Sequence, residues 1–182
     1  KYPCMGCRVN VVSTDKDFSY RIFEKLSNAG VTLFTYVPDL GNANIIKIAD
    51  DSNETTAILL SSEDEGVAIC AGADLAGSRS VLLMQSSGVG NCPNILSLIK
   101  SAGFPLLMIV TMRGDYGEQN PWQYPMGEAV EPILTAMGVQ TIWVNREDEL
   151  DAAIDASLSA VFKGGQGVAL IISQKFLGAK EF

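Results

Sequence analysis

The residues around Glu63 combine types that suit proton chemistry. Ser62, Glu63, Asp64 and Glu65 precede the segment 66–73, whose small apolar residues predict a helix. Ser62 as N-cap and Glu65 at the third helical position would form a capping box, with the other two carboxylates complementing the helix dipole. That interpretation explains Glu65 better than Glu63. Because the helix is apolar all round, we expect it to pack on every side. Glu63, at its N-terminus, would then be a desolvated carboxylate that shares a proton with a partner.

A glycine-rich turn follows another predicted strand. The run 87–91 (SGVGN) stands between a strand and a helix, as a dinucleotide-binding fingerprint does. The match is broken because Pro93 replaces the third glycine and no acidic residue ends the next strand at the usual spacing. A tight turn with Asn91 as N-cap and Pro93 in the first helical turn is the alternative. In both cases Gly88 and Gly90 permit a close backbone approach to a flat ligand.

The segment 113–127 (RGDYGEQNPWQYPMG) has no apolar period and is rich in aromatic residues, prolines and glycines. A loop of this length inside a compact domain is usually functional, and the bulky aromatic residues argue against disorder. Trp122 and Tyr124 either cover a subunit interface or contact a substrate, because aromatic residues are enriched in both settings.

Arg113 is the one cation in the four loops that follow the first four predicted strands. Its guanidinium group could receive an anionic group of a substrate, since the planar fork matches carboxylates and other oxyanions. Alternatively, it could pair with Asp115 or Glu118 within its own loop. The sequence leaves both interpretations open.

Composition excludes several classes of protein. The chain has 182 residues, a formal net charge of −8 and no histidine. Without histidine it cannot by itself build a Ser-His-Asp triad, a Cys-His pair or a histidine-bearing zinc site. An acidic chain with no Lys/Arg cluster predicts no binding to nucleic acid. The longest apolar runs are strand-sized, so we expect no membrane span.

The cysteines predict a reducing, cytoplasmic setting. Cys4 and Cys7 form a C-x-x-C in an irregular lead-in, residues 1–12, and are either incidental thiols or a labile metal or redox site. Cys70 and Cys92 are expected to be small buried residues. No basic and then apolar leader is visible; the chain starts at a lysine rather than a methionine, which leaves a removed segment open.

Strand and helix patterns alternate along the chain. Continuous apolar runs, which are typical of strands covered on both faces, occur at 31–36, 56–60, 81–85, 106–111, 140–144 and 168–173. One intervening helix is predicted from a cap at Thr14 to a stop at Gly30, and another from Asn145, with Asp148 three residues on, to Gly164. We therefore predict a single α/β domain over residues 1–182, a three-layer α/β/α fold with a mainly parallel six-stranded sheet. Ligands of such sheets bind beyond the carboxyl ends of the strands.

Three motifs together resemble the pyrimidine-binding (PYR) domain of thiamine-diphosphate enzymes. They are Glu63 followed nine residues later by Gly72, then QSSGVGN after the next strand, then the loop 113–127. Among these enzymes the chain is similar to the α subunits of sulfopyruvate decarboxylases and to phosphonopyruvate decarboxylases. The resemblance extends from about Thr14 to the C-terminus. Its E-x8-G spacing selects Glu63 over Glu65 as the counterpart of the glutamate that activates the cofactor.

The resemblance implies a role for each matching position. In this family the glutamate hydrogen-bonds N1′ of the aminopyrimidine of thiamine diphosphate, which makes Glu63 the expected catalytic residue. The expected cofactor-binding residues are Glu63, Gln85, Ser87, Gly88, Val89 and Asn91, and the expected substrate-binding residues are Pro38, Arg113 and Asp115. The expected reaction is decarboxylation of a small anionic 2-oxo acid, sulfopyruvate or else phosphonopyruvate.

Two departures from the family pattern matter. Several relatives carry histidines in the loop that corresponds to 113–117, where this chain has Arg-Gly-Asp-Tyr-Gly. The G-D-G and N-N elements of the diphosphate-binding half are also missing, since Tyr116 breaks the motif begun by Gly114 and Asp115. The resemblance therefore implies half an active site, with Mg²⁺ and the diphosphate held by a β subunit in a hetero-oligomer and no metal ligand in this chain. A non-catalytic, nucleotide-binding or regulatory α/β module is the alternative.

Overall fold

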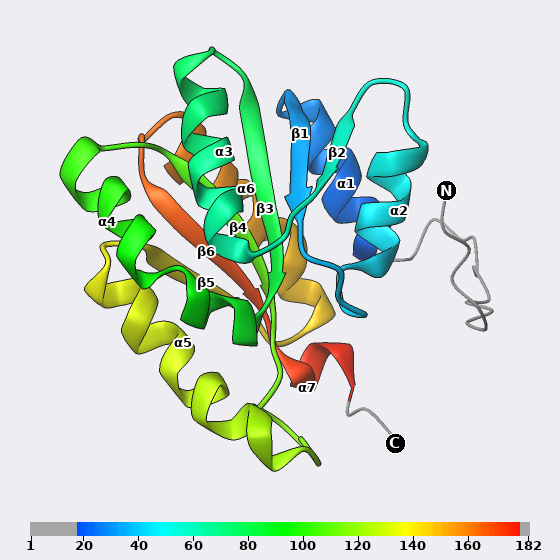
Figure 1. Ribbon diagram of the computed structural model, residues 1–182. Helices are drawn as coiled ribbons and strands as arrows, with labels where there is room; N and C mark the ends of the chain where they lie inside the picture. Colours follow the sequence, from blue (N-terminus) through cyan, green and yellow to red (C-terminus); the bar gives the residue numbers. More distant parts are fainter. Residues whose placement is uncertain (1–17, 179–182) are drawn as a thin grey trace.

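A six-stranded, entirely parallel sheet forms the centre of the computed structural model, which describes residues 18–178 (Figure 1). Its order is β2-β1-β3-β4-β6-β5. The strands are β1 (Val31–Tyr36), β2 (Thr56–Leu59), β3 (Arg79–Gln85), β4 (Leu106–Thr111), β5 (Gln140–Val144) and β6 (Gly167–Ile172). All six predicted strands are present with ends within two residues of the prediction, and the predicted fold class is confirmed.

Helices cover both faces of the sheet (Figure 1). The α-helices are α1 (Phe18–Asn28), α2 (Ala43–Asp51), α3 (Glu63–Leu75), α4 (Pro93–Ala102), α5 (Tyr124–Ala136), α6 (Leu150–Phe162) and the short α7 (Gln174–Leu177). Three 3₁₀ turns are η1 (Ser86–Asn91), η2 (Pro121–Gln123) and η3 (Glu147–Glu149). Helices α1, α2 and α6 pack on one face and α3, α4 and α5 on the other, giving two hydrophobic cores.

Strand β4 shows how one strand serves both cores. Leu107 and Ile109 belong to the core under α1, α2 and α6, while Leu106, Met108 and Val110 belong to the core under α3, α4 and α5. Successive side chains of a strand point to opposite faces, so a strand buried on both faces must be apolar throughout. This requirement explains the continuous apolar runs of the sequence.

The order of the strands creates two switch points, where the connections that leave neighbouring strands go to opposite faces of the sheet. The first lies between β1 and β3, because β1 leads to α2 on one face and β3 leads to α4 on the other. The second lies between β4 and β6, because β4 leads to α5 on one face and β6 leads to α7 on the other. Loops that leave neighbouring strands at a switch point diverge and leave a crevice. The exits of β1, β3, β4 and β6 therefore form the edge at which a ligand is expected.

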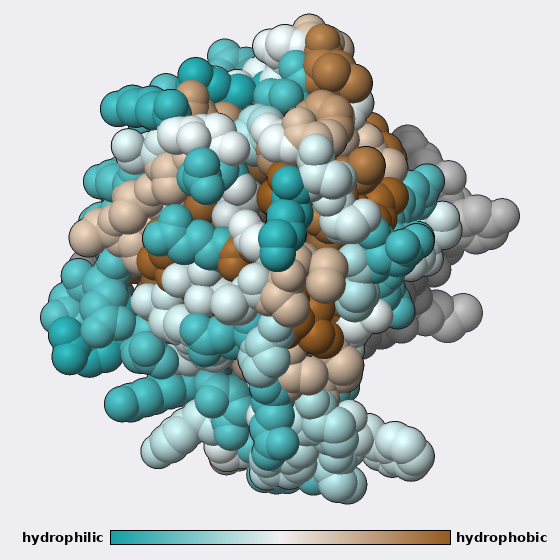
Figure 2. All heavy atoms as spheres, turned by 90° about the vertical axis from the view of Figure 1, so that its left-hand side faces the viewer, coloured by the Kyte–Doolittle hydropathy of each residue, from teal (hydrophilic) through white to brown (hydrophobic). Residues whose placement is uncertain are grey.

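Helix α3 departs from its prediction. Its inner face is buried through Val67 and Cys70, whereas Ala68, Gly72 and Leu75 on its outer face are exposed. The prediction that this helix packs on every side is therefore wrong for the described residues. Figure 2 views the face covered by α3, α4 and α5 and shows exposed hydrophobic side chains gathered in its upper part, with polar side chains around them.

The helix ends confirm some predictions and correct others. Gly30 has a φ of +79° and ends the first helix as predicted. At the start of α6 the backbone N–H groups of Asn145 and Arg146 donate to Glu149, and Asp148 instead pairs with Arg146, so the predicted Asn145–Asp148 cap is wrong by one position. The predictions for Cys4, Cys7, Thr14 and residues 1–12 concern positions outside the described residues. None of the helices within 18–178 is long and apolar enough to cross a membrane.

Two glycines of α3 provide a test of this packing. A Cβ atom on Gly66 would lie 2.5 Å from Cδ1 of Leu82 and 2.7 Å from Cδ1 of Leu60, whereas one on Gly72 would meet nothing within 4 Å. We predict that Gly66→Ala lowers the free energy of unfolding by roughly 1 kcal/mol or more through overpacking. Gly72→Ala should raise it by roughly 0.5–1 kcal/mol, because alanine loses less chain entropy in a helix. Urea denaturation measures both changes in the free energy of unfolding, and two changes of the same sign would contradict the packing described.

Candidate active site

Glu63 is a buried carboxylate at the carboxyl edge of the sheet. It is the first residue of α3, four residues after the end of β2, and it is 8% exposed. Its Oε2 atom accepts a hydrogen bond of 2.7 Å from Nδ2 of Asn91, the last residue of η1. The helix N-terminus favours a negative charge at this position. The structure thus brings together two residues that the sequence placed 28 positions apart.

Gly88 lies directly against the carboxyl group of Glu63. A Cβ atom at Gly88 would be 2.4 Å from Oε1 and 2.5 Å from Cδ of Glu63, distances that leave no room for a side chain. The glycine therefore lets the backbone of η1 approach the carboxylate. The close approach predicted from the sequence is made, within this chain, to Glu63.

The turn before α4 differs in detail from its prediction. Residues 86–91 form a 3₁₀ turn, and the N-cap of α4 is Cys92, without a side-chain capping bond. The prediction of Asn91 as N-cap is wrong, because its side chain donates to Glu63 instead. Pro93 is the first residue of α4, as predicted.

The acidic start of α3 also corrects the capping-box prediction. Ser62 is the N-cap, but its side chain makes no capping bond and donates to Asp64. Glu65 accepts from the backbone N–H of Ser61 at 2.9 Å and from its hydroxyl at 2.7 Å, which lowers the pKa of Glu65. Glu65 is thus hydrogen-bonded to Ser61 at the exposed surface, while Glu63 is buried.

Cys92 lies beside the Glu63–Gly88 contact. Its Sγ atom is 3.5 Å from the carbonyl oxygen of Gly88. Burial, together with the negative charges of Glu63 and Asp64, raises the pKa of the Cys92 thiol to about 12. The thiol therefore stays neutral near neutral pH. Cys70 is buried as well, and the prediction for both cysteines is confirmed.

The remaining expected cofactor-binding residues have different surroundings. Gln85 ends β3, and its Oε1 atom accepts a 2.9 Å hydrogen bond from the exposed Ser87 hydroxyl. The side chain of Val89 is completely buried in the core under α3, α4 and α5. Val89 could therefore meet a ligand only through its backbone.

Asp39 anchors the loop that follows β1. Its Oδ1 atom accepts hydrogen bonds from the backbone N–H groups of Gly41 at 2.6 Å and Asn42 at 3.2 Å, and from Oγ1 of Thr111 at 3.0 Å. These bonds tie the exit of β1 to the end of β4 and hold the exposed Pro38 at the edge of the site. This role of Asp39 is not among the sequence-based predictions, although an Asp followed two residues on by Gly after a strand is a signal for such a turn.

Arg113 and Glu118 form a buried ion pair where β4 ends. Nε of Arg113 lies 2.5 Å from Oε2 of Glu118, and Nη2 lies 2.8 Å from Oε1. Glu118 also accepts from the backbone of Gly114 and Asn120 and from Nε2 of Gln174. The Arg113 hydrogen bond is the largest cause that holds the pKa of Glu118 far below its usual range. Of the alternatives left open for Arg113, the structure shows the pair with Glu118.

Gln174 supports the loop after β4 and is not among the residues predicted from the sequence. It is buried just after β6, donates to Glu118, and its Oε1 atom accepts from the backbone N–H of Asp115 at 2.7 Å. The carboxylate of Asp115 accepts from the backbone N–H of Gln174 at 3.3 Å. Its position at a strand exit was the available signal, because β6 adjoins β4 at the second switch point.

The Glu63–Asn91 pair and the Arg113–Glu118 pair belong to one edge of the sheet, where hydrogen bonds join η1 to the end of β4. The Ser86 hydroxyl accepts from the backbone N–H of Arg113 at 2.9 Å and lies 3.1 Å from its carbonyl oxygen. Within residues 18–178 no group of three or more His, Cys, Asp or Glu is placed to hold a metal ion. The chemistry offered by this part of the chain is a buried carboxylate, oriented by an amide, beside the backbone of Gly88.

Comparison with known proteins identifies relatives over most of the chain. No protein-family model matches it. The sulfopyruvate decarboxylase subunit alpha of Methanocaldococcus jannaschii is 34% identical over 154 residues, 84% of this chain and 91% of that one. The sulfopyruvate decarboxylase of Methanosarcina acetivorans is 30% identical over 88% of this chain but only 41% of its own length. The phosphonopyruvate decarboxylase of Streptomyces viridochromogenes is 31% identical over 72% of this chain and 34% of that one.

A solved structure shares the fold. The 2-oxoglutarate:ferredoxin oxidoreductase from Magnetococcus marinus, determined with 2-oxoglutarate, coenzyme A and succinyl-CoA bound, superposes with a TM-score of 0.65. The match covers 87% of this chain and 29% of that one, at 12% sequence identity. It therefore supports the architecture alone.

The Arg113–Glu118 pair generates a prediction about stability and pH. Glu118→Gln should lower the free energy of unfolding at pH 7 by about 3 kcal/mol, because it leaves a buried guanidinium uncompensated. The folded pKa of Glu118 lies below its ordinary value of about 4.3, so the pair stabilises fully above that pH and loses its effect as pH falls below it. The difference between variant and parent should therefore shrink on acidification, as measured by urea denaturation across pH.

Glu147→Gln is the matched control. Glu147 pairs with Arg21 at 3.4 Å but is 73% exposed, so its replacement should change stability by less than about 0.5 kcal/mol at every pH. Equal losses in the two variants would refute the structural role assigned to Glu118.

Proposed function

The chain belongs to the family of sulfopyruvate decarboxylase α subunits, and from this premise we propose that it forms the pyrimidine-binding half of a thiamine-diphosphate-dependent 2-oxo acid decarboxylase acting on sulfopyruvate. One observation carries the proposal most directly. The buried Glu63 is oriented by Asn91 and lies against the bare backbone of Gly88 at the ligand-binding edge of the sheet. That arrangement suits a carboxyl group that hydrogen-bonds a ring nitrogen.

The residues at this edge fit the aminopyrimidine ring of the cofactor. A flat ring can lie along a strip of backbone without side chains, and η1 contributes Gly88, which is buried against Glu63, and Gly90, which is exposed. A ring nitrogen needs a carboxyl partner screened from water, and Glu63 is 8% exposed. Gln85 and Ser87 add polar groups at the rim of the strip. No positive side chain for a diphosphate is needed here, because the partner is expected to hold that group.

Each residue then has a defined task in the reaction. When bound, thiamine diphosphate supplies the ring that accepts the electron pair released as CO₂ leaves a 2-oxo acid. Glu63 holds a proton at the pyrimidine nitrogen. Asn91 fixes the carboxyl group by donating to its Oε2 atom, and Gly88 confines the carboxyl group from the side of Oε1. Cys92 remains neutral beside them and adds no competing charge.

The proposal requires a partner subunit. Relatives of this length are named as alpha subunits. We propose that a β subunit supplies the Mg²⁺ and diphosphate ligands and docks on the carboxyl edge of the sheet, forming a hetero-oligomer. A cytoplasmic location, predicted from the cysteines, stays a prediction.

The choice of substrate rests on the relatives and on the loop after β4. Sulfopyruvate is preferred because the relatives that share most of their length with this chain carry its name; phosphonopyruvate is the alternative. The charge of Arg113 is compensated by Glu118, so direct binding of the anionic tail by Arg113 loses support. Arg113 instead shapes the loop that carries Asp115, and Pro38 lies exposed across the edge.

The alternative of a nucleotide-binding module also loses support. A glycine turn binds phosphates by directing backbone N–H groups at them in a neutral or positive setting. Here the carboxylate of Glu63 lies against Gly88. Its negative charge would repel a phosphate at this turn.

Glu63→Gln tests the proposed catalytic group. With the partner subunit, thiamine diphosphate and Mg²⁺, the parent chain should release CO₂ from sulfopyruvate, and the variant should lose at least roughly a hundredfold in kcat, the scale of one general acid or base. Glu65→Gln, two residues along the same helix and exposed, is the control and should retain activity. Full activity of Glu63→Gln would remove the proposed mechanism.

Gly88→Ala tests the space beside the carboxylate. The added methyl group would displace the flexible carboxyl group of Glu63, so we expect a large loss of kcat with little change in stability. Gly72→Ala is the control, because its Cβ would meet nothing within 4 Å. Decarboxylase assays and thermal unfolding of both variants separate the two effects, and comparable activity of the two would argue against the contact.

A further inference from the structure

Large apolar side chains are exposed in the segment that follows β4. Among residues 18–178 seven large hydrophobic residues are exposed, and three of them, Tyr116, Trp122 and Tyr124, lie in the segment that runs from the end of β4 to the first residue of α5. Two others are Leu40, in the loop after β1, and Leu59, the last residue of β2. Several exposed aromatic residues in one loop are typical of a surface that another protein covers.

Trp122 is the most exposed of these residues, at 87%, and Tyr116 is exposed to 60%. A tryptophan left in water at the surface of a monomer gives up a large hydrophobic contribution. Tryptophan and tyrosine are also the residues that most often dominate the energy of protein interfaces. This pair is the strongest candidate for an anchor on the edge.

The support under Trp122 is stiff. Its backbone N–H donates to Oδ1 of Asn120 at 3.1 Å, and the N–H of Asn120 donates to Oε1 of the buried Glu118 at 2.9 Å. The hydroxyl of Tyr124 donates to the carbonyl oxygen of Glu118. A side chain presented on a pre-organised loop loses less entropy when a partner binds it.

The same loop is attached to the catalytic edge. Hydrogen bonds join Ser86 of η1 to the backbone of Arg113, and a Cβ on Gly114 would lie 2.0 Å from the carbonyl oxygen of Gln123, so the two ends of the loop are closely packed. A protein that binds Trp122 is therefore held in a fixed position relative to η1 and Glu63.

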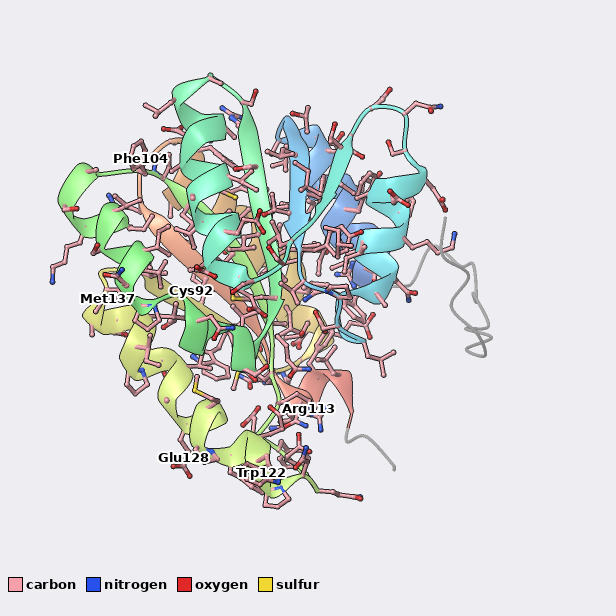
Figure 3. The ribbon with its side chains drawn as sticks, in the orientation of Figure 1. Cys92, Phe104, Arg113, Trp122, Glu128 and Met137 are labelled. Carbon is pink, nitrogen blue, oxygen red and sulfur yellow. The ribbon has the colours of Figure 1, made fainter. Side chains whose placement is uncertain are left out.

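Direct contact of Trp122 with the substrate fits the structure less well. Figure 3 shows Trp122 at the lower tip of the molecule, well below Cys92, which lies beside the Glu63–Gly88 contact, with Arg113 between the two levels. The side chain is also almost completely exposed rather than lining a pocket. Of the alternatives that the sequence left open for Trp122, the interface is favoured.

A longer relative, in which a region similar to this chain is only part of one polypeptide, indicates which partner covers this surface. The match to the Methanosarcina acetivorans decarboxylase leaves more than half of that chain outside it. We infer that Trp122 and Tyr116 anchor this chain to the partner subunit that carries the diphosphate-binding half of the site. The inference rests on the proposed function for the identity of the partner, and on the exposed aromatic side chains and the hydrogen-bonded backbone at Trp122 for its position.

The test measures assembly and catalysis separately. Trp122→Ala and Tyr116→Ala are prepared in the full chain and titrated by calorimetry with the separately purified partner subunit of the same organism. Leu75→Ala is the control, because Leu75 is 76% exposed but lies at the far end of α3 from Glu63. We expect Trp122→Ala to weaken assembly at least roughly tenfold, and Tyr116→Ala to weaken it less. At saturating partner the kcat for sulfopyruvate should return to the parent value.

The outcomes distinguish this inference from the proposed function. An unchanged dissociation constant for Trp122→Ala, with folding confirmed by circular dichroism, overturns the inference. So does a variant that assembles normally but has a raised KM for sulfopyruvate, since that result assigns Trp122 to the substrate. If the parent chain assembles in a Trp122-dependent way but releases no CO₂, the inference stands and the proposed function falls. If the parent chain does not bind the partner at all, both fall.

Discussion

The parallel direction of all six strands is the constraint on which the candidate site depends. It delivers every strand-exit loop to one edge, so that polar residues far apart in the sequence can meet there without disturbing the two apolar cores. Two reversals in the strand order then separate neighbouring loops. One reversal brings together the exits of β1 and β3, and the other those of β4 and β6. The positions of Glu63 and of the aromatic loop are consequences of this single arrangement.

Two buried carboxylates at this edge have different hydrogen-bond partners, and this difference supports the different roles proposed for them. Glu118 is paired with a guanidinium and accepts several further hydrogen bonds, so its negative charge is fully compensated and it serves to hold the loop. Glu63 receives a neutral amide from Asn91 and lies beside the backbone of Gly88. Among residues 18–178 no ion pair of Glu63 is found, and a carboxylate of this kind is the better partner for a basic nitrogen of a ligand.

The same edge explains why this chain acts as a subunit in the proposed enzyme. Its carboxylate and backbone strip suit one end of an extended cofactor, and no metal-binding cluster is found within residues 18–178. Exposed aromatic residues lie in the segment after β4. Rigid attachment of the aromatic loop to η1 would let one docking event both bury apolar surface and complete the catalytic site.

The sequence by itself determined the strands and several helix ends, because apolar runs and glycine stops are local properties of the chain. The choice of Glu63 rests on the motif spacing of the family that the sequence resembles, and its catalytic role stays a prediction. The tertiary structure alone decided the partner of Arg113, the side-chain contact of Asn91 and the role of Gln174. These depend on which loops become neighbours across the sheet. Since β6 lies between β4 and β5, that neighbourhood does not follow the order of the chain, and a pattern read along the chain does not contain it.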